Sequence, residues 1–369
     1  MSTEKNTSRF WKRFRKNKAA MVALCFIFLT ILIALFAYPL SPDNTPNANR
    51  MIVEISTQKP GYTCLFLKKT KNQLIEPSNA FQFLLNGKET NYDLIPIKNF
   101  VFKNDSILVN HIIDDENQEQ LLFSLKELNI ATSLPKAEIE KQLIIKKKFW
   151  LGTDRFGRDM LSRLFIGTRV SLAVGFIAVI LSVFIGLFLG AVSGYFGGWS
   201  DQVITWLINV IWAIPTLLLV FAITFVLGKG FWQIFIAVGL TMWVGTARLI
   251  RGQVMSLKEL EYIQVAKTMG YSSFRIIVKH ILPNVLGPTM VMAASNFATA
   301  ILIEAGLSFL GIGVQPPVSS WGLMIKENYN FIITNRPLLA IIPGIAIMLI
   351  VLAFNILGNA LRDALDVKG

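Results

Sequence analysis

Long apolar segments and polar stretches alternate along the chain. Six apolar segments are long enough to cross a bilayer, whose hydrocarbon core needs about 20 helical residues. They cover residues 19–40, 170–194, 203–227, 231–247, 287–306 and 338–357. The pattern predicts an all-α membrane protein with six transmembrane helices. Gly186, Gly190 and Gly194 recur every four residues in the second segment and predict close packing against another helix.

The polar region between the first two apolar segments, residues 41–148, is long enough to fold as a domain with its own core. Alternating apolar residues predict strands in its first part, and leucines between residues 121 and 128 form a helical stripe. A second helix is predicted from Ser133 to residue 148. We expect a small α+β domain whose apolar strand faces are covered by the leucine stripe. The predicted strands are residues 51–56, 62–67 and 106–113.

A polar stretch, residues 257–283, separates the fourth and fifth apolar segments. Apolar residues recur on one helical face of this stretch, at Leu257, Leu260, Ile263, Ala266 and Met269 or Gly270. Gly270 is expected to end the helix in the left-handed conformation, because glycine lacks the Cβ that penalises it. Ser272 or Ser273 can cap a second short helix that reaches residue 281. The stretch therefore predicts a helix–glycine–helix hairpin at a membrane surface, suited to docking and not to spanning.

Basic residues set the predicted orientation. Residues 1–18 carry seven Lys or Arg and one acidic residue, and six more Lys or Arg lie between Arg248 and Lys279. Cytoplasmic segments of membrane proteins are enriched in these residues. With six helices, the inward-facing parts carry 15 Lys or Arg against 6 Asp or Glu, out of a net charge of +13. We therefore expect both termini and the hairpin in the cytoplasm, and residues 41–148 outside.

The composition is that of an integral membrane protein, with 53% apolar residues and a mean hydropathy of +0.52. Because the positive charge follows the membrane topology, we expect no nucleic-acid partner. The sequence contains no Walker A, HExxH or CxxC pattern, and its two cysteines, Cys25 and Cys64, lie in an apolar segment and in the polar region. We expect no disulfide, no catalytic, cofactor or metal site, and no ATP hydrolysis by this chain itself.

A few polar residues fall within the apolar segments. Asn209 and Asn296 suit interhelical hydrogen bonds, with the lining of a substrate path as the alternative. Glu304 is the one acidic residue near the interior of a segment, which makes it a functional-site hypothesis by default. Its place at the outer end of a helix favours contact with solvent instead. An autonomous secondary transporter, the alternative from another class, would place charged relays within the bilayer, and the sequence shows no such relay.

The hairpin resembles the EAA loop of ABC-importer permeases, whose pattern is E-A-A, three residues, Gly, nine residues and I-x-L-P. Here the triplet reads Gln264-Val265-Ala266, Gly270 follows, and the final group is 280–283, HILP. Gln, Val and His depart from the pattern, and an acidic residue stands one helical turn before the triplet. In that family the loop inserts into a cleft on a cytoplasmic ATPase subunit and transmits its motion to the membrane. The resemblance implies these coupling residues: Glu261, Gln264, Ala266, Gly270, His280, Leu282 and Pro283.

Three further stretches are similar to the oligopeptide/dipeptide/nickel branch of the same family. They are LGTDRFGRDMLSR at 151–163, GLSFLGIGVQPPVSSWG at 306–322 and AFNILGNALRDALD at 353–366. The first stretch and its continuation place four arginines on the outward side, against the charge rule: Arg155, Arg158, Arg163 and Arg169. The family's outer signature loops imply these candidate residues: Gly152, Asp154, Gly157, Arg158, Asp159, Gln315, Pro316, Pro317 and Trp321.

The resemblance implies the type I ABC-importer fold of a C-type permease. Residues 1–18 would be a cytoplasmic tail, 19–40 the first transmembrane helix and 149–369 the core permease domain. Residues 41–148 lie outside the resemblance, since family members have a much shorter connection there. The implied function is translocation of di- or oligopeptides across the bacterial cytoplasmic (inner) membrane by alternating access. Nickel chelates or other small solutes are the alternative substrates.

The implied partners are a homologous second permease, two ABC ATPase subunits, an extracytoplasmic solute-binding protein and membrane lipid. ATP and magnesium would bind to the partner subunits, so we expect no cofactor on this chain. Two interpretations of residues 41–148 stay open. The region is either a contact site for the solute-binding protein or a decoration on a loop that tolerates insertion.

Overall fold

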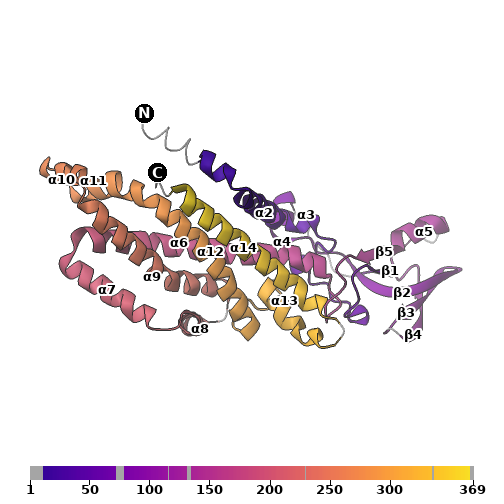
Figure 1. Cartoon of the computed structure of the whole chain (residues 1–369). Coiled ribbons are helices and arrows are strands. Elements are labelled where there is room, and N and C mark those ends of the chain that lie inside the picture. The colour runs from indigo at the N-terminus through magenta and orange to yellow at the C-terminus, as the bar shows by residue number, and fades with distance from the viewer. Residues whose placement is uncertain are drawn as a thin grey trace. The chain divides into compact units, whose positions relative to one another are not determined.

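The computed structural model describes residues 11–71, 79–114, 116–130, 134–228, 230–334 and 336–365 (Figure 1). The chain forms two compact units. The helical unit comprises Met1–Leu32, Val170–Gln315 and Gly344–Gly369, and the sheet unit comprises Ile33–Arg169 and Pro316–Pro343. Each unit therefore combines segments that lie far apart in the sequence.

Within the described residues, five long helices are apolar enough to cross a membrane. They are α2 (Lys18–Leu35), α6 (Met160–Phe196), α9 (Phe231–Lys258), α12 (Leu282–Leu310) and α14 (Leu338–Leu365). Helices that meet lipid on one side and other helices on the other are apolar over most of their surface, as these are. Five of the six predicted transmembrane segments thus coincide with long apolar helices. The first of them, predicted over residues 19–40, is interrupted after Leu35, and its last four residues form the separate short helix α3 (Ala37–Leu40).

The apolar segment predicted to cross the membrane over residues 203–227 is helical, but the chain bends sharply within it. Helices α7 (Gly198–Trp212) and α8 (Thr216–Leu227) together are apolar enough for a span, but they are bent by 94° at the break. In Figure 1 α8 is seen nearly end-on beside α7. Pro215 explains the break, since it lacks an N–H donor and disfavours helical backbone at the preceding residue. This sixth apolar segment is therefore either a broken span or a re-entrant pair of helices.

Glycines let α6 and α9 approach closely, as their spacing predicts. A Cβ atom on Gly190 would lie 2.6 Å from the carbonyl oxygen of Ala247, and one on Gly194 would lie 2.8 Å from that of Arg251. Gly186 is equally confined by α9. Any larger residue at these positions would push the two helices apart, so the small-residue face is a packing device.

Polar residues within the helices make interhelical hydrogen bonds, also as predicted. The Nδ2 atom of Asn296 donates to Thr246 Oγ1 at 3.2 Å and lies 3.4 Å from Ser182 Oγ. These contacts join α12 to α9 and α6. The Oδ1 atom of Asn209 accepts from Arg248 Nη2 at 3.1 Å and joins α7 to α9. Satisfying such groups between helices avoids an unpaired polar atom in hydrocarbon.

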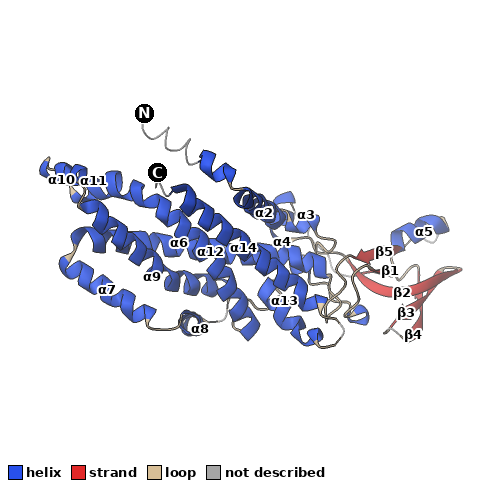
Figure 2. Ribbon diagram, viewed as in Figure 1, coloured by secondary structure: helices blue, strands red, loops and turns tan. Residues whose placement is uncertain are grey.

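A five-stranded antiparallel sheet forms the core of the sheet unit (Figure 2). Its strands are β1 (Tyr62–Thr70), β2 (Tyr92–Lys103), β3 (Ser106–Ile112), β4 (Gln118–Ser124) and β5 (Ile144–Phe149), in the spatial order β4-β3-β2-β1-β5. Helix α5 (Lys136–Leu143) packs against the sheet, and its Ile139 and Leu143 lie in one buried cluster with Leu67 and Val109. The α+β domain predicted here is therefore confirmed, and β1 and β3 match predicted strands.

Two local predictions in this region are wrong. Residues 51–56 form no strand and contain the 3₁₀ turn η2 (Val53–Ile55) instead. The leucine-rich helix predicted over 121–128 is strand β4 followed by a turn. The reason is tertiary pairing, since Leu122 lies opposite Leu108 in the ladder with β3, and ladder pairing outweighs a weak local preference for helix.

The helix predicted to reach residue 148 is also too long. It ends at Leu143, and the next six residues extend instead as β5, paired with β1 at an edge of the sheet. Three consecutive lysines in β5 suit an edge strand, which charged side chains protect from further pairing. The predicted start of this helix at Ser133 lies outside the described residues. Strand β2 was not predicted, because Pro96 interrupts its apolar pattern.

Short elements complete the sheet unit. They are α3 (Ala37–Leu40), η1 (Pro46–Ala48), α4 (Ala80–Asn86), α13 (Trp321–Asn328) and η4 (Tyr329–Ile332). Helix α13 and η4 come from the segment between α12 and α14, so two distant parts of the chain build this unit.

Candidate coupling hairpin and buried ion-pair cluster

The predicted hairpin lies between α9 and α12 in the helical unit. Helix α10 (Glu261–Thr268) is followed by α11 (Ser273–Ile276) and by the π-helical turn η3 (Ile277–Ile281), which runs into α12. In Figure 1 α10 and α11 lie together at one end of the helical unit. Ser272 caps α11, because its Oγ atom accepts a hydrogen bond from the N–H of Arg275 at 3.4 Å.

Gly270 ends α10 in the left-handed conformation, with a φ of +79°. Its N–H donates to the carbonyl of Lys267, and the N–H of Tyr271 donates to that of Ala266, both at 3.1 Å. These two bonds satisfy carbonyl groups that the end of a helix leaves free. A Cβ atom at residue 270 would meet nothing within 4 Å. Backbone conformation, and not crowding, therefore calls for glycine here.

The apolar face predicted for α10 is only partly buried. Ile263 and Ala266 are buried in a cluster with Ile250 of α9. Leu260 and Met269, expected on the same face, are exposed. Both lie at the ends of α10, where the backbone leaves the helical path, so the 3.6-residue period no longer sets their direction.

The outer surface of the hairpin is also apolar. Val265, Met269 and Phe274 are 54%, 66% and 76% exposed. Large exposed apolar side chains grouped on one surface are typical of sites that a partner covers. The hairpin thus has a buried base and an uncovered apolar edge.

The remaining coupling candidates hold the hairpin together or face outward. The Nε2 atom of Gln264 donates to the carbonyl of Lys258 at 2.9 Å and ties α10 to the end of α9. Glu261 is exposed in the first turn of α10, where a negative charge is favourable next to the helix N-terminus. The ring of His280 stacks on that of Tyr271, with 6.2 Å between centroids, so it is a contact within the hairpin.

The second helix of the hairpin does not end before α12, contrary to the prediction that it stops at residue 281. Leu282 and Pro283 form the first turn of α12, with Leu282 packed on the hairpin cluster and Pro283 exposed. The N–H of Leu282 donates to the carbonyl of Ile277, five residues earlier. A wide turn of this kind accommodates a proline ring without breaking the helix.

A buried cluster of ion pairs lies in the sheet unit. Arg158 Nε is 2.7 Å from Asp154 Oδ2, and Arg158 Nη2 is 2.5 Å from Glu327 Oε2. Arg163 Nη2 is 3.1 Å from the same Glu327 oxygen, and its Nε is 3.6 Å from Asp154 Oδ2. Asn49 Oδ1 accepts from Arg158 Nη1 at 3.2 Å. Two positive and two negative charges thus balance one another away from water.

This cluster explains arginines that oppose the charge rule. Arg158 and Arg163 are neutralised by buried carboxylates, and Arg169 Nη1 donates to the carbonyl of Leu85 at 2.7 Å. They are structural groups and not free surface charges. Sequence reasoning missed Glu327, which lies 164 residues from Arg163 in the chain. The signal in the sequence was the group of arginines on the outward side, since buried arginines require carboxylates that neutralise them.

The two outer signature stretches pack on one another. Trp321 Nε1 donates to the carbonyl of Leu164 at 3.1 Å, across 157 residues of sequence. A Cβ atom on Gly167 would lie 3.1 Å from the Trp321 ring, so this glycine leaves room for the indole. A cis peptide bond joins Pro316 and Pro317 just before this contact. The structure therefore brings Trp321 to the segment that carries Asp154 and Arg158.

Two glycines of the first signature stretch close tight turns. Gly152 and Gly157 have φ values of +77° and +71°. A Cβ atom on Gly157 would overlap the carbonyl oxygen of Ile52, and one on Gly152 would overlap that of Gln58. Both positions therefore require glycine for its conformation and for its small size.

Asp159 borders a cavity of about 250 Å³ in the sheet unit, together with Asp43, Arg50 and Lys147. Its Oδ2 atom accepts from Ser162 Oγ at 2.6 Å. Burial raises the pKa of Asp159 above its ordinary range, and burial lowers the pKa of Lys147. In each case burial disfavours the charged form of the group.

Gln315 belongs to the helical unit, apart from the other outer signature residues. Its Nε2 atom donates to the carbonyl of Gly313 at 2.9 Å. Glu304 is fully buried and accepts from Ser308 Oγ at 2.7 Å, and that hydroxyl accepts from the N–H of Val314 at 3.0 Å. The expectation that Glu304 contacts solvent is wrong. The carboxyl group orients the hydroxyl that holds the loop after α12.

Residues 182–368, more than half of the chain, match the family described as the binding-protein-dependent transport system inner membrane component. The chain belongs to this family. Residues 6–60 match the N-terminal transmembrane domain of oligopeptide transport permease C. The permease is thus a multi-pass inner-membrane component of an ABC importer that works with a binding protein and an ATPase. It is a transport subunit and not an enzyme, as predicted.

Relatives of the permease come from peptide systems. It is 44% identical over 219 residues to the dipeptide transport system permease protein DppC of Alkalihalophilus pseudofirmus, across 59% of this chain and 72% of that protein. It is 42% identical over 219 residues to the glutathione transport system permease protein GsiD of Pectobacterium atrosepticum, with the same coverage. An inward-facing structure of the MetNI methionine ABC transporter matches 56% of the permease and 97% of its own chain, at 20% identity and a TM-score of 0.43. The predicted resemblance to oligopeptide and dipeptide permeases is confirmed.

Proposed function

We propose that the permease carries di- or oligopeptides across the inner membrane as one of two homologous membrane subunits, by alternating access. Its relatives named above, a dipeptide and a glutathione permease, support this substrate class. A solute-binding protein would deliver the peptide from outside. Two ABC ATPase subunits would bind ATP and magnesium, and this chain would bind no cofactor.

The divided surface of the hairpin is the observation that carries the coupling role. Ile263 and Ala266 hold its base in the helical unit, while Val265, Met269 and Phe274 form an uncovered apolar edge. An ATPase subunit that buries this edge gains apolar contact area, and the buried base passes its displacement to α6, α9 and α12. The hairpin then acts as the lever between ATP binding and helix movement.

The hairpin and both termini would lie in the cytoplasm. Phe14 packs in one cluster with Ala360 and Ala364, so the two ends of the described chain lie on the same side of the helical unit. A Cβ atom on Gly287 would lie 3.1 Å from Leu365, next to the first turns of α12 that follow the hairpin. These contacts support one common side for the hairpin and the termini, and the excess of Lys and Arg there supports the cytoplasm.

Site-specific cross-linking tests the coupling role. Val265→Cys and Met269→Cys, each in a Cys25→Ala, Cys64→Ala background, should cross-link to the ATPase subunit in the assembled complex. Gln253→Cys, an exposed position on α9, is the matched control and should not. Cross-links at residue 253 but not at 265 and 269 would contradict docking through the apolar edge.

Ligand binding to the cognate solute-binding protein tests the substrate class. Calorimetric titration with dipeptides, longer peptides, glutathione and nickel chelates should give binding to peptides. The ligand-loaded binding protein should then stimulate ATP hydrolysis by the reconstituted complex. Stimulation by nickel chelates alone would replace peptides as the substrate and leave the coupling role in place.

A further inference from the structure

The connection between β1 and β2 leaves the sheet. Strand β1 ends at Thr70 and β2 begins at Tyr92, with α4 between them. Two to five residues are enough to join paired antiparallel strands. This longer connection instead brings α4 against α3, the short helix that follows the first span (Figure 1).

Hydrogen bonds fix α4 in this place. Arg169 Nη1 donates to the carbonyls of Leu84 and Leu85 at 3.2 and 2.7 Å, which satisfies the last turn of the helix. The N–H of Lys88 donates to the carbonyl of Asn44 at 2.9 Å. Side-chain and backbone bonds therefore both tie the end of α4 to the neighbouring segments of the sheet unit.

The inner face of α4 is closely packed. Phe83 contacts a buried cluster that contains Ala37 and Tyr38. Gly87, with a φ of +78°, lies directly under Tyr38, because a Cβ atom there would be 2.7 Å from the tyrosine ring. The orientation of α4 on α3 is thus set by packing, and so is the direction of its opposite face.

That opposite face is apolar and uncovered. Phe81 and Leu85, one helical turn apart, are 70% and 42% exposed, and α4 contains no charged residue. The end of the first span and α3 also expose large apolar side chains, namely Leu35, Phe36 and Leu40. Leu35 is the last residue of a helix long and apolar enough to cross a membrane, and Phe36 and Leu40 follow it directly, so we infer that these side chains lie at the edge of the bilayer. Helix α4 belongs to the same unit as these side chains and packs on α3, which follows the end of the first span directly.

We propose that α4 is an interfacial helix that inserts Phe81 and Leu85 into the lipid beside the end of the first span. Phe and Leu side chains form the face of an interfacial helix that enters the lipid. In α4 the opposite face packs on protein, through Phe83. The helix would anchor the β1–β2 connection, and with it the sheet, to the bilayer. Lipid, and not a protein partner, covers this face.

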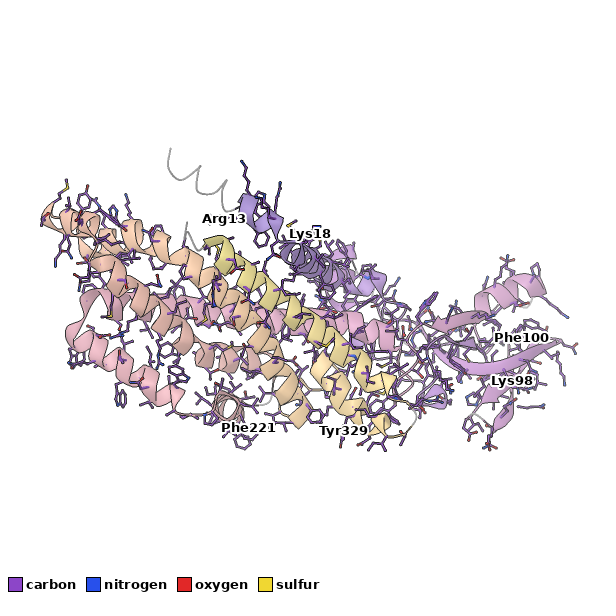
Figure 3. All side chains as sticks on the ribbon, viewed as in Figure 1. Arg13, Lys18, Lys98, Phe100, Phe221 and Tyr329 are labelled. Atoms are coloured by element: carbon purple, nitrogen blue, oxygen red, sulfur yellow. The ribbon has the colours of Figure 1, made fainter. Side chains whose placement is uncertain are left out.

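Accessibility of spin labels in the complete transporter, reconstituted in nanodiscs, tests this proposal. Labels are placed on Phe81→Cys and Leu85→Cys in a Cys25→Ala, Cys64→Ala background. Phe28→Cys, exposed within the first span, is the lipid control, and Lys98→Cys, exposed on β2 (Figure 3), is the water control. The measurement compares collision rates with oxygen, which is enriched in lipid, and with a water-soluble nickel chelate.

The ratio of oxygen to chelate accessibility at residues 81 and 85 should exceed one and approach the ratio at residue 28. A ratio below one, like that at residue 98, would show that water covers α4. Low accessibility to both reagents would show that another protein subunit covers it. Either of these two results overturns the proposal.

Discussion

Gly270 in the helix–glycine–helix hairpin and Gly157 in the sheet unit have similar backbone conformations, with φ values of +79° and +71°. Their surroundings differ. A Cβ atom at Gly270 would meet nothing within 4 Å, whereas one at Gly157 would overlap the carbonyl oxygen of Ile52. Position 270 requires glycine only for its backbone conformation. Position 157 requires glycine for its backbone conformation and also because there is no space for a Cβ atom. The hairpin is therefore open at its surface, while the signature turn is closed by its own unit.

Charged residues of the two regions show the same contrast. Glu261 and Lys267 of the hairpin are exposed, whereas Asp154, Arg158 and Glu327 are buried or nearly so. Exposed charges contribute little to stability, but removing one partner of a buried cluster leaves an uncompensated charge. The charges of the hairpin thus contribute little to its stability, whereas each charge of the buried cluster depends on its partners within the sheet unit.

The largest effect is expected for Gly157→Ala. The added Cβ must displace the Ile52 backbone, so the substitution should cost about 4 kcal/mol or more of stability. Thermal unfolding of the purified complex and the level of assembled protein measure this loss. Gly61→Ala is the matched control, because Gly61 also has a positive φ, +85°, but open space around it. Equal losses for the two variants would contradict the packing requirement.

The next largest loss of stability is expected for Glu327→Gln. It keeps the shape of the side chain but removes the charge that faces Arg158 and Arg163, and breaking a buried ionic cluster costs about 3–5 kcal/mol. The unfolding temperature of the complex should fall strongly. Glu119→Gln, an exposed change on β4, should leave it unchanged. An unfolding temperature for Glu327→Gln within error of that control would show that the cluster contributes no net stability.

Gly270→Ala should have a smaller effect on stability, about 1–2 kcal/mol and confined to the hairpin, since only the left-handed backbone is penalised. Peptide-stimulated ATP hydrolysis and uptake should fall while assembly stays normal. Gly252→Ala is the control, because it also has open space but lies inside α9, where alanine favours helix. Loss of transport in both variants would mean that local strain at residue 270 is not the cause.

The smallest effect concerns pH and the cavity of the sheet unit. The lowered pKa of Lys147 means that the unfolded chain binds more protons between the folded and unfolded pKa values, so this contribution to stability grows as pH rises through that window. Asp159, with a raised pKa, contributes stability that is lost as pH rises through its folded value. Lys147→Met should flatten the alkaline rise in unfolding temperature, and Lys98→Met, an exposed control, should keep it. A rise that persists in Lys147→Met would assign it to other groups.

Local chemistry determined a large part of this protein. The length of the apolar segments predicted six spans, of which the described residues form five as long helices and the sixth as a bent pair, because a bilayer fixes the helix length that it accommodates. The helix and glycine around residue 270 predicted the hairpin, because capping depends on a few neighbouring residues. The glycine spacing on α6 predicted a close helix contact, because small residues four positions apart lie on one face of a helix and let a neighbouring helix approach. Motifs at 151–163, 257–283 and 306–322 pointed to the family before any contact was known.

Only the tertiary structure decided which distant groups meet. Glu327 joins Arg158 and Arg163, β4 replaces a predicted helix, and α4 returns from the sheet to the end of the first span. Each of these three outcomes depends on a partner that lies more than a few residues away in the sequence. A pattern of neighbouring residues carries no information about such a partner. A strand gains its stability from the neighbouring strand, and a buried charge from its counter-charge. For this reason the hairpin could be predicted from neighbouring residues. The ion-pair cluster could not, because residues 49, 154–163 and 327 meet only in the folded chain.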